Sequence, residues 1–596
     1  MASETRIYSS LDIIRQLWGQ AQLPSAVLEN TIARGNVMLP HDPAEVGQGV
    51  KSSFQLTAVA QGICAGISLA HRLCAVVEEM EGGEEVDKMV LDRVVVDARH
   101  ALAEYKGWTR VHLGQEQDLQ EMLKTSIPSD SDMARSILDI PPTAVSDWDP
   151  LAGLYRTLPN PNRSIPGMVR IHTNFPHHKL GILQLLKLVP TKVKWNDEGI
   201  QEIFARFTKD DVQREVANWD AFELEEKAQG RGLCVTAYRS AEEWEASAMG
   251  KAVKSWMNET GGSAFRISRI ANVTTAAPQK TSSSTSRKAR RLRVIDMSRV
   301  IAGPISTRTL AALGSDVLLL SSPLLPNLPL RELDTARGKR TAHLTLPRSP
   351  SPHLPAEMIE LIQGADVFSQ AYRPQALSQR GLSAESIQAL RPGIIYAELC
   401  AFGFTGPWAG RRAYDSLTQT ACGMNHLESI NYNNFTERSG EGREVAPKAL
   451  PVQALDYAAG SLMCFATLAC KIRASLERVS SGDKKGGEEG ERGWKVQVSL
   501  ASTAEWIKSL GQVHDEQAWE LPPKDVIPED AEVLADMVSG YKVRGLKGSA
   551  SLHDEEERVV RVLAIRHASL RASDTQGGED RRWGVPAHLG VDELRW

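Results

Sequence analysis

The second half of the chain alternates short apolar runs with helical patterns. Four runs rich in β-branched and other apolar residues lie at 292–298, 315–321, 365–371 and 393–400. The segment after the first run, IAGPISTRTLAALG, enters a helix through Gly303-Pro304 and ends at Gly314. Strands separated by helices of this length indicate βαβ units and a parallel sheet. We therefore predict an α/β, doubly wound fold for this half.

The first half has a different pattern. It begins with helical periodicity, after which LAGLYRT (151–157) and GMVRIHTNF (167–175) read as a hairpin. The stretch VQREVANWDAFELEEKAQGRG (212–232) predicts one amphipathic helix that ends at a glycine. These signals predict a smaller α+β domain that lies N-terminal to the doubly wound one.

A polar stretch divides the chain. TTAAPQKTSSSTSRKAR, residues 274–290, has no apolar periodicity and reads as a flexible linker. The predicted divisions are a helical first part, a small α+β domain, the linker, a nucleotide-type α/β domain and a C-terminal segment, over residues 1–145, 146–265, 266–290, 291–515 and 516–596.

An internal repeat points to one particular carboxylate. Residues 52–73 and 92–105 resemble residues 452–472 and 494–506: both pairs couple a helix of small residues to an alternating strand and a further helix. Aligned through Gly62 and Gly460, the first copy has Ala58 where the second has Asp456. Asp456 is therefore either a helix N-terminal acid, stabilised by about 0.3–1 kcal/mol, or a nucleophile. The repeat favours the nucleophile, because a similar helix starts with alanine.

The composition of the chain limits the classes of partner and the environment that we expect for it. The 69 basic and 74 acidic side chains give a net charge of −5, which argues against a nucleic-acid partner. Seven scattered cysteines without a CxxC pair indicate reduced thiols. The sequence shows neither a secretory signal nor 18 consecutive apolar residues, so we expect a soluble, cytoplasmic protein without membrane contact.

Other motifs are less specific. The turn at Gly303-Pro304 allows close approach of a ligand, and a basic cluster that includes Lys339 and Arg340 suits phosphate. HTNFPHH (172–178) has neither the HExxH spacing nor a companion cysteine pair, so no metal site is predicted. No GxSxG elbow supports serine catalysis.

Five collinear stretches carry a family resemblance. VIDMSRVIAGPISTRTLAALGSDVLLL, DTARGKRTAHLTL, ADVFSQAYRPQALSQRGLS, LRPGIIYAELCAFGFTGPWAGRRAYDSLTQTACGM and LPVQALDYAAGSLM resemble blocks of the family III CoA-transferases, whose relatives include α-methylacyl-CoA racemase. Together they cover about residues 290 to 510. The resemblance implies the doubly wound family III fold, coenzyme A as a substrate and no permanently bound cofactor.

The resemblance also implies roles for individual residues. Asp456 falls on the family's catalytic aspartate. The positions that match CoA-contacting or active-site residues are Ile301, Lys339, Arg340, Ala371, Tyr372, Arg373, Arg380, Arg412 and Tyr414. The chain departs from the family where relatives often have asparagine at the position of Ala371, and Arg380 is displaced by one residue.

The order of the domains also departs from the family, whose small domain follows the catalytic block. The first half therefore resembles a degenerate copy of the family fold that kept the small domain but lost the aspartate. This copy is fused to the second half in one chain. Family members form interlocked dimers, so we expect either a homodimer or a fused pseudo-dimer.

The resemblance predicts an enzyme that moves CoA from an acyl-CoA donor to a carboxylic acid through an aspartyl-acyl anhydride and an aspartyl-CoA thioester. The alternatives are an acyl-CoA racemase of the same fold and a catalytically degenerate CoA-binding protein. Racemase-type relatives carry histidine at the position of Tyr414, and a tyrosine of ordinary pKa is a poor base near neutrality, so the transferase is favoured. The sequence does not identify the donor or acceptor acid.

Overall fold

The computed structural model describes most of the chain. The described residues are 6–80, 85–107, 111–114, 127–128, 149–271, 291–346, 353–438, 447–480, 492–520, 537–544, 559–568, 582–584 and 593–596. Every structural statement below concerns these residues.

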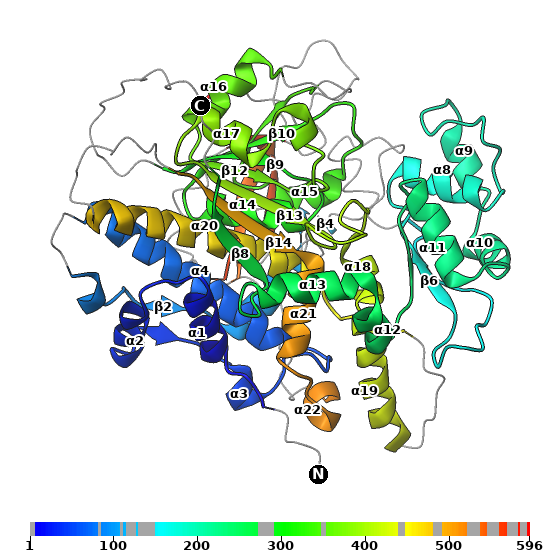
Figure 1. Ribbon diagram of the computed structural model, residues 1–596, viewed down its shortest axis with the longest axis horizontal. Helices are drawn as coiled ribbons and strands as arrows, with labels where there is room; N and C mark the ends of the chain where they lie inside the picture. The colour runs from blue at the N-terminus through cyan, green and yellow to red at the C-terminus, as the bar shows by residue number, and fades with distance from the viewer. Residues whose placement is uncertain are drawn as a thin grey trace.

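A seven-stranded sheet forms the centre of the fold (Figure 1). Its strands, in spatial order, are β11 (Arg340–His343), β10 (Asp316–Ser321), β9 (Arg293–Met297), β12 (Val367–Gln370), β13 (Ile395–Cys400), β14 (Trp494–Ser499) and β8 (Phe265–Arg269). All neighbours are parallel except β8, which runs antiparallel to β14. Counted from β9, the six parallel strands follow the order 3-2-1-4-5-6 of doubly wound dinucleotide-binding folds. The α/β doubly wound prediction is confirmed.

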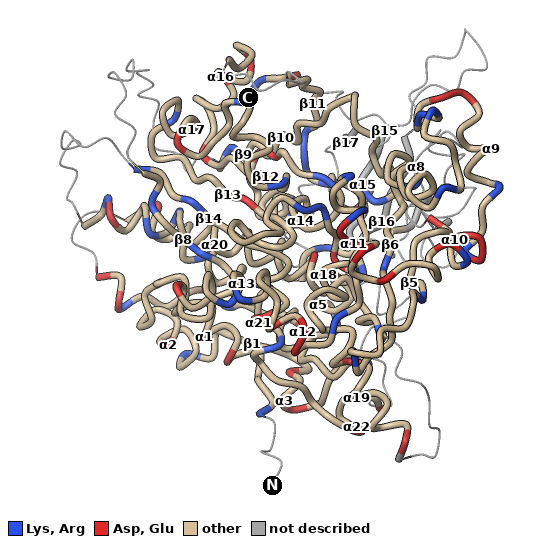
Figure 2. Tube along the Cα trace, turned by 45° about the vertical axis from the view of Figure 1, so that its right-hand side comes forward, with Lys and Arg blue, Asp and Glu red and all other residues tan. Residues whose placement is uncertain are grey.

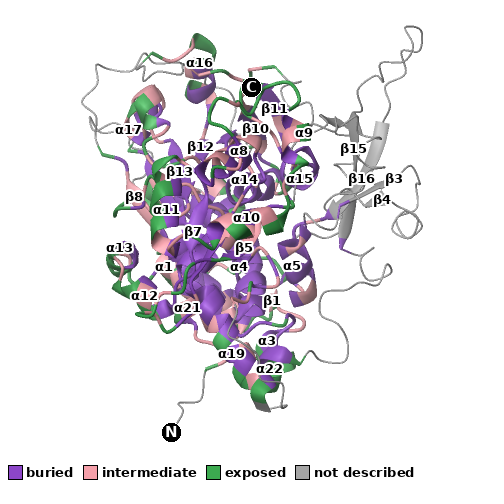
Figure 3. Cartoon of the chain, turned by 90° about the vertical axis from the view of Figure 1, so that its right-hand side faces the viewer, coloured by how far each residue is buried: buried purple, intermediate pink, exposed green. Residues whose placement is uncertain are grey.

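Two long helices pack side by side below this sheet. α20 (Ala454–Ser480) lies between the sheet and α4 (Leu56–Glu79), and both helices are buried along most of their length (Figures 1 and 3). Gly66 of α4 faces the Phe465 ring, from which a Cβ at this position would lie at an ordinary contact distance of 3.6 Å. Both helices are long and apolar enough to cross a membrane, but most of their residues lie inside the structure, as in a folded core. The first and second halves of the chain therefore share one core.

The two repeated segments have the same order of elements. α4 is followed by β2 (Val94–Val95) and α5 (Ala98–Tyr105), and α20 is followed by β14 and α21 (Leu500–Ser509). Their strands differ in environment, because β14 lies in the main sheet whereas β2 pairs only with β1 (Val37–Met38).

A separate small core is formed by residues 151–237. Its antiparallel sheet contains β5 (Gly153–Arg156), β6 (Met168–Ile171) and β7 (Val235–Ala237), and its helices are α8 (Pro176–Leu185), α9 (Ile200–Phe204), α10 (Lys209–Val216) and α11 (Ala221–Gly230). The single helix predicted over 212–232 is wrong: α10 and α11 are separate, because Asp220 accepts hydrogen bonds from the N–H groups of Phe222 and Glu223 and starts a new helix.

Several predicted boundaries also need correction. Residues 241–265 do not belong to the small core, because Trp244 and Val253 of α12 (Ala241–Ala246) and α13 (Ala248–Asn258) pack into the main one. The linker cannot begin at 266, because β8 pairs with β14 as far as Arg269; residues 272–290 lie outside the described part. The boundaries near 145 and 516 assign strands of one sheet to different domains. Before 145 this sheet contains β3 (His112–Gly114) and β4 (Ile127–Pro128), and after 516 it contains β15 (Val538–Arg544), β16 (Val559–Ile565) and β17 (Arg582–Gly584).

The remaining helices surround the sheet and the two long helices, except that α14 is buried between the sheet and α20. They are α1 (Ser10–Gln20), α2 (Ser25–Ala33), α3 (Pro43–Val46), α14 (Ala302–Ala312), α15 (Pro329–Thr335), α16 (Ala356–Gly364), α17 (Ala384–Leu390), α18 (Asp415–Ala421), α19 (Met424–Arg438) and α22 (Asp515–Trp519). Basic and acidic residues are interspersed along the trace (Figure 2), in agreement with a net charge near zero. All seven cysteines are buried and free.

Candidate active site

The candidate site lies where the order of the sheet reverses. β9 and β12 are neighbours in the sheet, and the crossovers that follow them lead to opposite sides of it. The carboxyl ends of these two strands therefore leave a crevice between them. Doubly wound folds bind their ligands in this crevice. A cleft of about 580 Å³ opens there. The segments Arg299–Gly303, after β9, and Ala371–Pro374, after β12, line it.

The turn after β9 is tightly constrained. Val300 adopts φ of 73°, a left-handed conformation that is unusual for a β-branched residue and that is found mostly at functional sites. Gly303 packs so closely on the end of β12 that a Cβ there would lie 2.5 Å from the Cβ of Ala371. This packing directs the N-terminus of α14 toward the cleft.

Asp456 lies at the floor of the cleft, as the third residue of α20. Gly460, one turn later, allows α20 to approach α14, because a Cβ at this position would lie 2.3 Å from the carbonyl oxygen of Ala302. The side chain of Asp456 therefore lies next to the start of α14. Only 7% of Asp456 is exposed.

The carboxyl group of Asp456 accepts no hydrogen bond from any of the described residues, although its backbone N–H donates to Asp415. Burial, and then the nearby charge of Asp415, raise the pKa of Asp456 well above its ordinary value, while Arg331 opposes the shift. A carboxyl group held without partners at the floor of a cleft is available for a reaction.

Asp415 caps the helix that carries Asp456. Its Oδ2 accepts the backbone N–H groups of Leu455 at 2.8 Å and Asp456 at 3.0 Å, which would otherwise lack partners at the start of α20. Burial raises the pKa of Asp415 to about 6, although these hydrogen bonds and one from Gln419 favour its ionised form. Asp415 thus both positions Asp456 and repels its negative charge.

The rest of the cleft is apolar and strongly basic. Among the described lining residues Asp456 is the only acid, and the basic ones include Arg299, Arg373, Arg380, Arg411 and Arg412. Burial, and then repulsion by Arg412 and Arg380, lower the pKa of Arg373. Guanidinium groups that repel one another in a cleft with a single acid form a binding site for a polyanion such as a phosphate ester.

Aromatic and imidazole rings of the small core close one side of the cleft. Phe175, His177 and His178 line this side together with Tyr414, whose ring stacks on that of His172 with centroids 4.1 Å apart. Burial lowers the pKa of His172 to about 3, of His177 to about 4 and of His178 to about 2, so these rings are neutral near pH 7. Burial also raises the pKa of Tyr414 above its ordinary value. None of these groups is a base matched to neutral pH.

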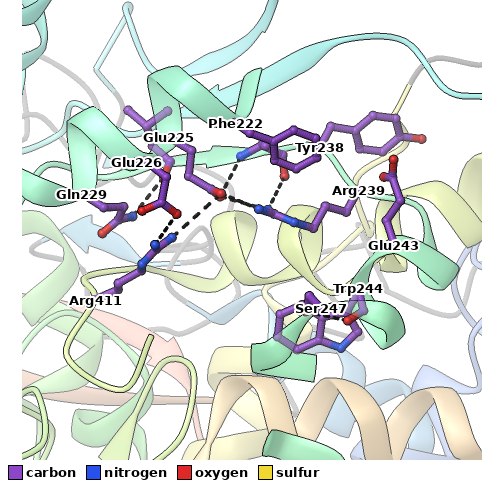
Figure 4. Close-up of polar contacts among 12 residues, drawn as sticks. Phe222, Glu225, Glu226, Gln229, Tyr238, Arg239, Glu243, Trp244, Ser247 and Arg411 are labelled. Carbon is purple, nitrogen blue, oxygen red and sulfur yellow. Dashed lines mark hydrogen bonds and ion pairs between the residues drawn. The ribbon is translucent and has the colours of Figure 1, made fainter. Parts of the chain in front are cut away.

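Ion pairs hold the small core against the cleft (Figure 4). Glu225 of α11 forms a buried ion pair with Arg239 and lies 3.8 Å from Arg411, which also pairs with Glu226. The next residue, Arg412, donates to the carbonyl of Gly232 at 2.9 Å. The loop that carries Arg412 and Tyr414 is thus bound to the small core.

The structure brings most of the predicted site residues together. Asp456 shares the cleft with Ile301, Ala371, Tyr372, Arg373, Arg380, Arg412 and Tyr414. Lys339 and Arg340 do not line it. Lys339 is 1% exposed and donates to Asp296 at 2.9 Å, and Arg340 pairs with Asp316 at 3.1 Å. The structure therefore gives no support to the prediction that these two residues contact CoA: the charge of Lys339 is paired inside the fold, and that of Arg340 is paired in a half-exposed position.

Several site residues were not singled out from the sequence. Arg299 directly follows the predicted strand at 292–298, a position at which a doubly wound sheet places ligand contacts. Asp415 follows the predicted Tyr414, and His177 and His178 lie in the segment for which only a metal role was considered. Only the fold could show that this distant segment lies opposite Asp456.

The fold and site define a doubly wound α/β protein with a basic cleft at the reversal of its sheet and a buried carboxyl group at the floor. Residues 290–509 match the model of CoA-transferase family III, and this part of the chain is a CoA-transferase family III domain.

Curated relatives match over parts of the chain. An acetyl-coenzyme A transferase of Hypoxylon pulicicidum is 27% identical over 233 residues, which are 38% of this chain and 35% of the relative. An acyl-CoA transferase of Gibberella moniliformis is 26% identical over 49% of this chain and 48% of the relative. A succinate–glutarate CoA-transferase of Agrobacterium fabrum is 31% identical over 23% of this chain and 38% of the relative. The matches thus span from about a third to a half of these relatives.

Solved structures are similar over a comparable part. A hypothetical protein from Mycobacterium tuberculosis matches with 26% identity and a TM-score of 0.29, over 37% of this chain and 56% of that one. A CAIB/BAIF family protein from Brucella suis matches with 23% identity and a TM-score of 0.28, over 37% of this chain and 54% of that one.

Proposed function

We propose that the protein is a CoA-transferase in which Asp456 is the acyl-accepting nucleophile. The observation that carries this proposal is the position of Asp456: a carboxyl group without hydrogen-bond partners among the described residues, at the floor of a cleft lined by five arginines. The cleft suits coenzyme A, because its apolar walls match the pantetheine arm and its arginines match the phosphates. The family III match supports the same function.

The reaction proceeds by two exchanges at one carboxyl group. The ionised Asp456 attacks the thioester carbonyl of the donor, which releases CoA thiolate and leaves an acyl-aspartyl anhydride. The thiolate attacks the aspartyl carbonyl, which releases the donor acid and leaves an aspartyl-CoA thioester. The acceptor carboxylate then attacks that carbonyl, and the freed thiolate takes the acceptor acyl group, which regenerates Asp456.

The residues around Asp456 assist these steps. The first N–H groups of α14 lack intrahelical partners and lie next to Asp456, so they are placed to stabilise the oxyanion of each tetrahedral intermediate. The hydrogen bonds from Leu455 and Asp456 to Asp415 keep the start of α20 fixed while the carboxyl group changes partners. The small core closes one side of the cleft and so limits the access of water, which would hydrolyse the anhydride.

The racemase alternative is less well supported. A racemase needs groups that exchange a proton with the α-carbon near neutral pH. The imidazoles on this wall have pKa values of about 2 to 4, and burial raises the pKa of Tyr414. These pKa values favour acyl transfer over proton abstraction. Deuterium incorporation at the α-carbon without an acceptor acid would reverse this choice.

The test is chemical capture of the intermediate. Incubation with an acyl-CoA donor should give a hydroxylamine-sensitive adduct on Asp456, detected by mass spectrometry, and Asp456→Asn should abolish both adduct and exchange. Asp92→Asn is the matched control, because the carboxylate of Asp92 is 94% exposed. Unchanged turnover in Asp456→Asn would refute the mechanism, and tight CoA binding without exchange for any donor would support a degenerate CoA-binding protein.

We further propose that one chain suffices for one site. The wall that carries His172 and Phe175 comes from the first half, and Asp456 comes from the second half. This arrangement supports a fused pseudo-dimer. A solution mass of one chain, with full exchange activity, is the expected result; activity confined to a dimer would contradict it.

A further inference from the structure

A second, smaller cavity lies on the other side of Asp456. This chamber has a volume of about 250 Å³ and shares Phe175, Val300, Ile301, Tyr414 and Asp456 with the cleft. Its remaining walls come from the small core and from the elements around α15, α18 and α20. The carboxyl group of Asp456 therefore faces two cavities, a large basic cleft and a small chamber.

The size of the chamber limits what it can hold. A cavity of about 150 Å³ accommodates benzene, which has six non-hydrogen atoms. By this measure, a chamber of about 250 Å³ holds roughly ten. The pantetheine arm of CoA is too large for it and fits the cleft, so the chamber is where the acyl group lies once it is joined to Asp456.

The charge of the chamber is unusual for an acyl site. Its basic residues are Arg170 and Lys209 of the small core and Arg331 of α15, and its acids are Asp415 and Asp456. Asp415 is engaged by the N–H groups at the start of α20, and acylation removes the charge of Asp456. While the enzyme is acylated, the chamber therefore contains three cations against one committed carboxylate.

Arg170 is the most informative of these cations. Its Nε donates to the hydroxyl of Thr420 at 2.9 Å, and no carboxylate of the described chain lies within ion-pair distance of its guanidinium group. Burial lowers the pKa of Arg170 to about 10, which leaves it charged at neutral pH. An apolar acyl chain would gain nothing from a desolvated guanidinium group, whereas an anionic group would form a charge-assisted hydrogen bond with it.

We infer that the chamber takes an acyl group that ends in a second carboxylate, that is, the monoacyl group of a dicarboxylic acid of about four to six carbons, as the volume argument allows. Arg170 and Lys209 bind the distal carboxylate, and Arg331 faces the reacting end at Asp456. This inference rests on the proposed function, because it assumes that the acyl group is carried by Asp456.

The test compares two five-carbon acids as CoA acceptors, with acetyl-CoA as the donor: glutarate, which has the second carboxylate, and pentanoate, which lacks it. The wild-type protein should prefer glutarate in kcat/KM by roughly ten- to a hundred-fold, the value of one charge-assisted hydrogen bond. Arg170→Met and Lys209→Met should reduce this preference toward one. Lys209 is exposed at the start of α10 and its substitution should not disturb folding. Lys192→Met, an exposed lysine outside the chamber, is the control and should keep the full preference.

The outcomes separate the two proposals. Equal use of both acids by an active wild-type protein, or a glutarate preference that survives both variants, would overturn the dicarboxylate inference while the transferase stands. Absence of exchange and of any adduct with acetyl-CoA, glutaryl-CoA or pentanoyl-CoA would overturn the proposed function. Calorimetric titration of glutarate into Asp456→Asn gives a readout without catalysis. Binding of glutarate that is lost when Arg170→Met is added to Asp456→Asn supports the chamber as the binding site. Equal binding with and without Arg170→Met refutes it.

Discussion

Replacement of the nucleophile should stabilise the protein while it abolishes exchange. In the folded protein, burial and the charge of Asp415 disfavour ionisation of Asp456, whereas in the unfolded chain its carboxyl group ionises at an ordinary pKa of about 3.9. Folding at neutral pH must therefore return a proton to Asp456 or confine an unpaired charge. Asp456→Asn has nearly the same shape and cannot ionise, so it removes the part of the cost that comes from the charge, which we expect to be roughly 1–3 kcal/mol, because burial without partners costs more for a charged group than for a neutral one.

The effect on thermal stability follows from the size of the cooperative unit. An unfolding entropy of about 2.1 cal/mol/K per residue gives about 1.3 kcal/mol/K for the chain of 596 residues, whose two halves share one core. The unfolding midpoint of Asp456→Asn should then rise by about 1–2 °C at pH 7, measured by scanning calorimetry, with Asp92→Asn unchanged.

The stability gain of Asp456→Asn should depend on pH. The pKa of Asp456 is raised in the folded state. The loss of unfolding free energy due to Asp456 is therefore absent below pH of about 4, where the group is protonated in both the folded and the unfolded state. This loss grows as the pH rises toward the folded-state pKa. The gain of Asp456→Asn should therefore be present at pH 7 and shrink as the pH falls. A variant that is less stable than the wild type at pH 7, or a gain that does not depend on pH, would refute this account of the site.

Three further substitutions test the surroundings of Asp456. Asp415→Asn removes a neighbouring charge and should move the acid limb of the pH–rate profile to lower pH, because the pKa of Asp456 falls; a limb that moves upward would contradict this. Lys339→Met leaves Asp296 buried without its partner and should cost about 3–5 kcal/mol of unfolding free energy; a selective rise in the KM for CoA at unchanged stability would restore its predicted role in CoA binding. Gly460→Ala forces α20 away from α14, where its Cβ would lie 2.3 Å from a carbonyl oxygen, and should lower kcat and cost about 1–3 kcal/mol; full activity would show that this close contact is unnecessary.

The parallel sheet was predictable because four of its six described parallel strands carry a local signal. A strand buried on both faces reads as a continuous apolar run, and the runs at 292–298, 315–321, 365–371 and 393–400 form β9, β10, β12 and β13. Asp456 was indicated by the internal repeat, in which Ala58 takes its place, and by the family resemblance. These signals are present in the sequence without knowledge of the fold.

The features that could not be predicted depend on distant segments. Lys339 has the sequence context of a ligand-binding residue, but its ammonium group finds Asp296, 43 residues away, inside the fold. The position of Asp415 under the first turn of α20 depends on the path of α18 and α19, and the run 212–232 breaks because Asp220 finds two free N–H groups. Charge and capping residues have several candidate partners in a sequence, and only tertiary packing selects one.

The repeated helix allows a last test of why only one copy has an acid. Ala58, the counterpart of Asp456 in the alignment, is also the third residue of its helix, but it is fully buried and lines neither the cleft nor the chamber. A carboxylate at position 58 would be buried without a cavity or a substrate to receive it, so Ala58→Asp should cost about 3–5 kcal/mol at pH 7, and less at low pH, where the group is protonated.

The matched control for this substitution is Ala58→Asn, which adds nearly the same volume without a charge. The difference in unfolding free energy between the two variants therefore reports the charge alone. Ala58→Asp should also fail to restore exchange to Asp456→Asn, because the reactivity of Asp456 depends on the cleft, the start of α14 and the cap from Asp415. Restored exchange in the double variant would mean that the first half has kept a working site, and would contradict its assignment as a degenerate copy.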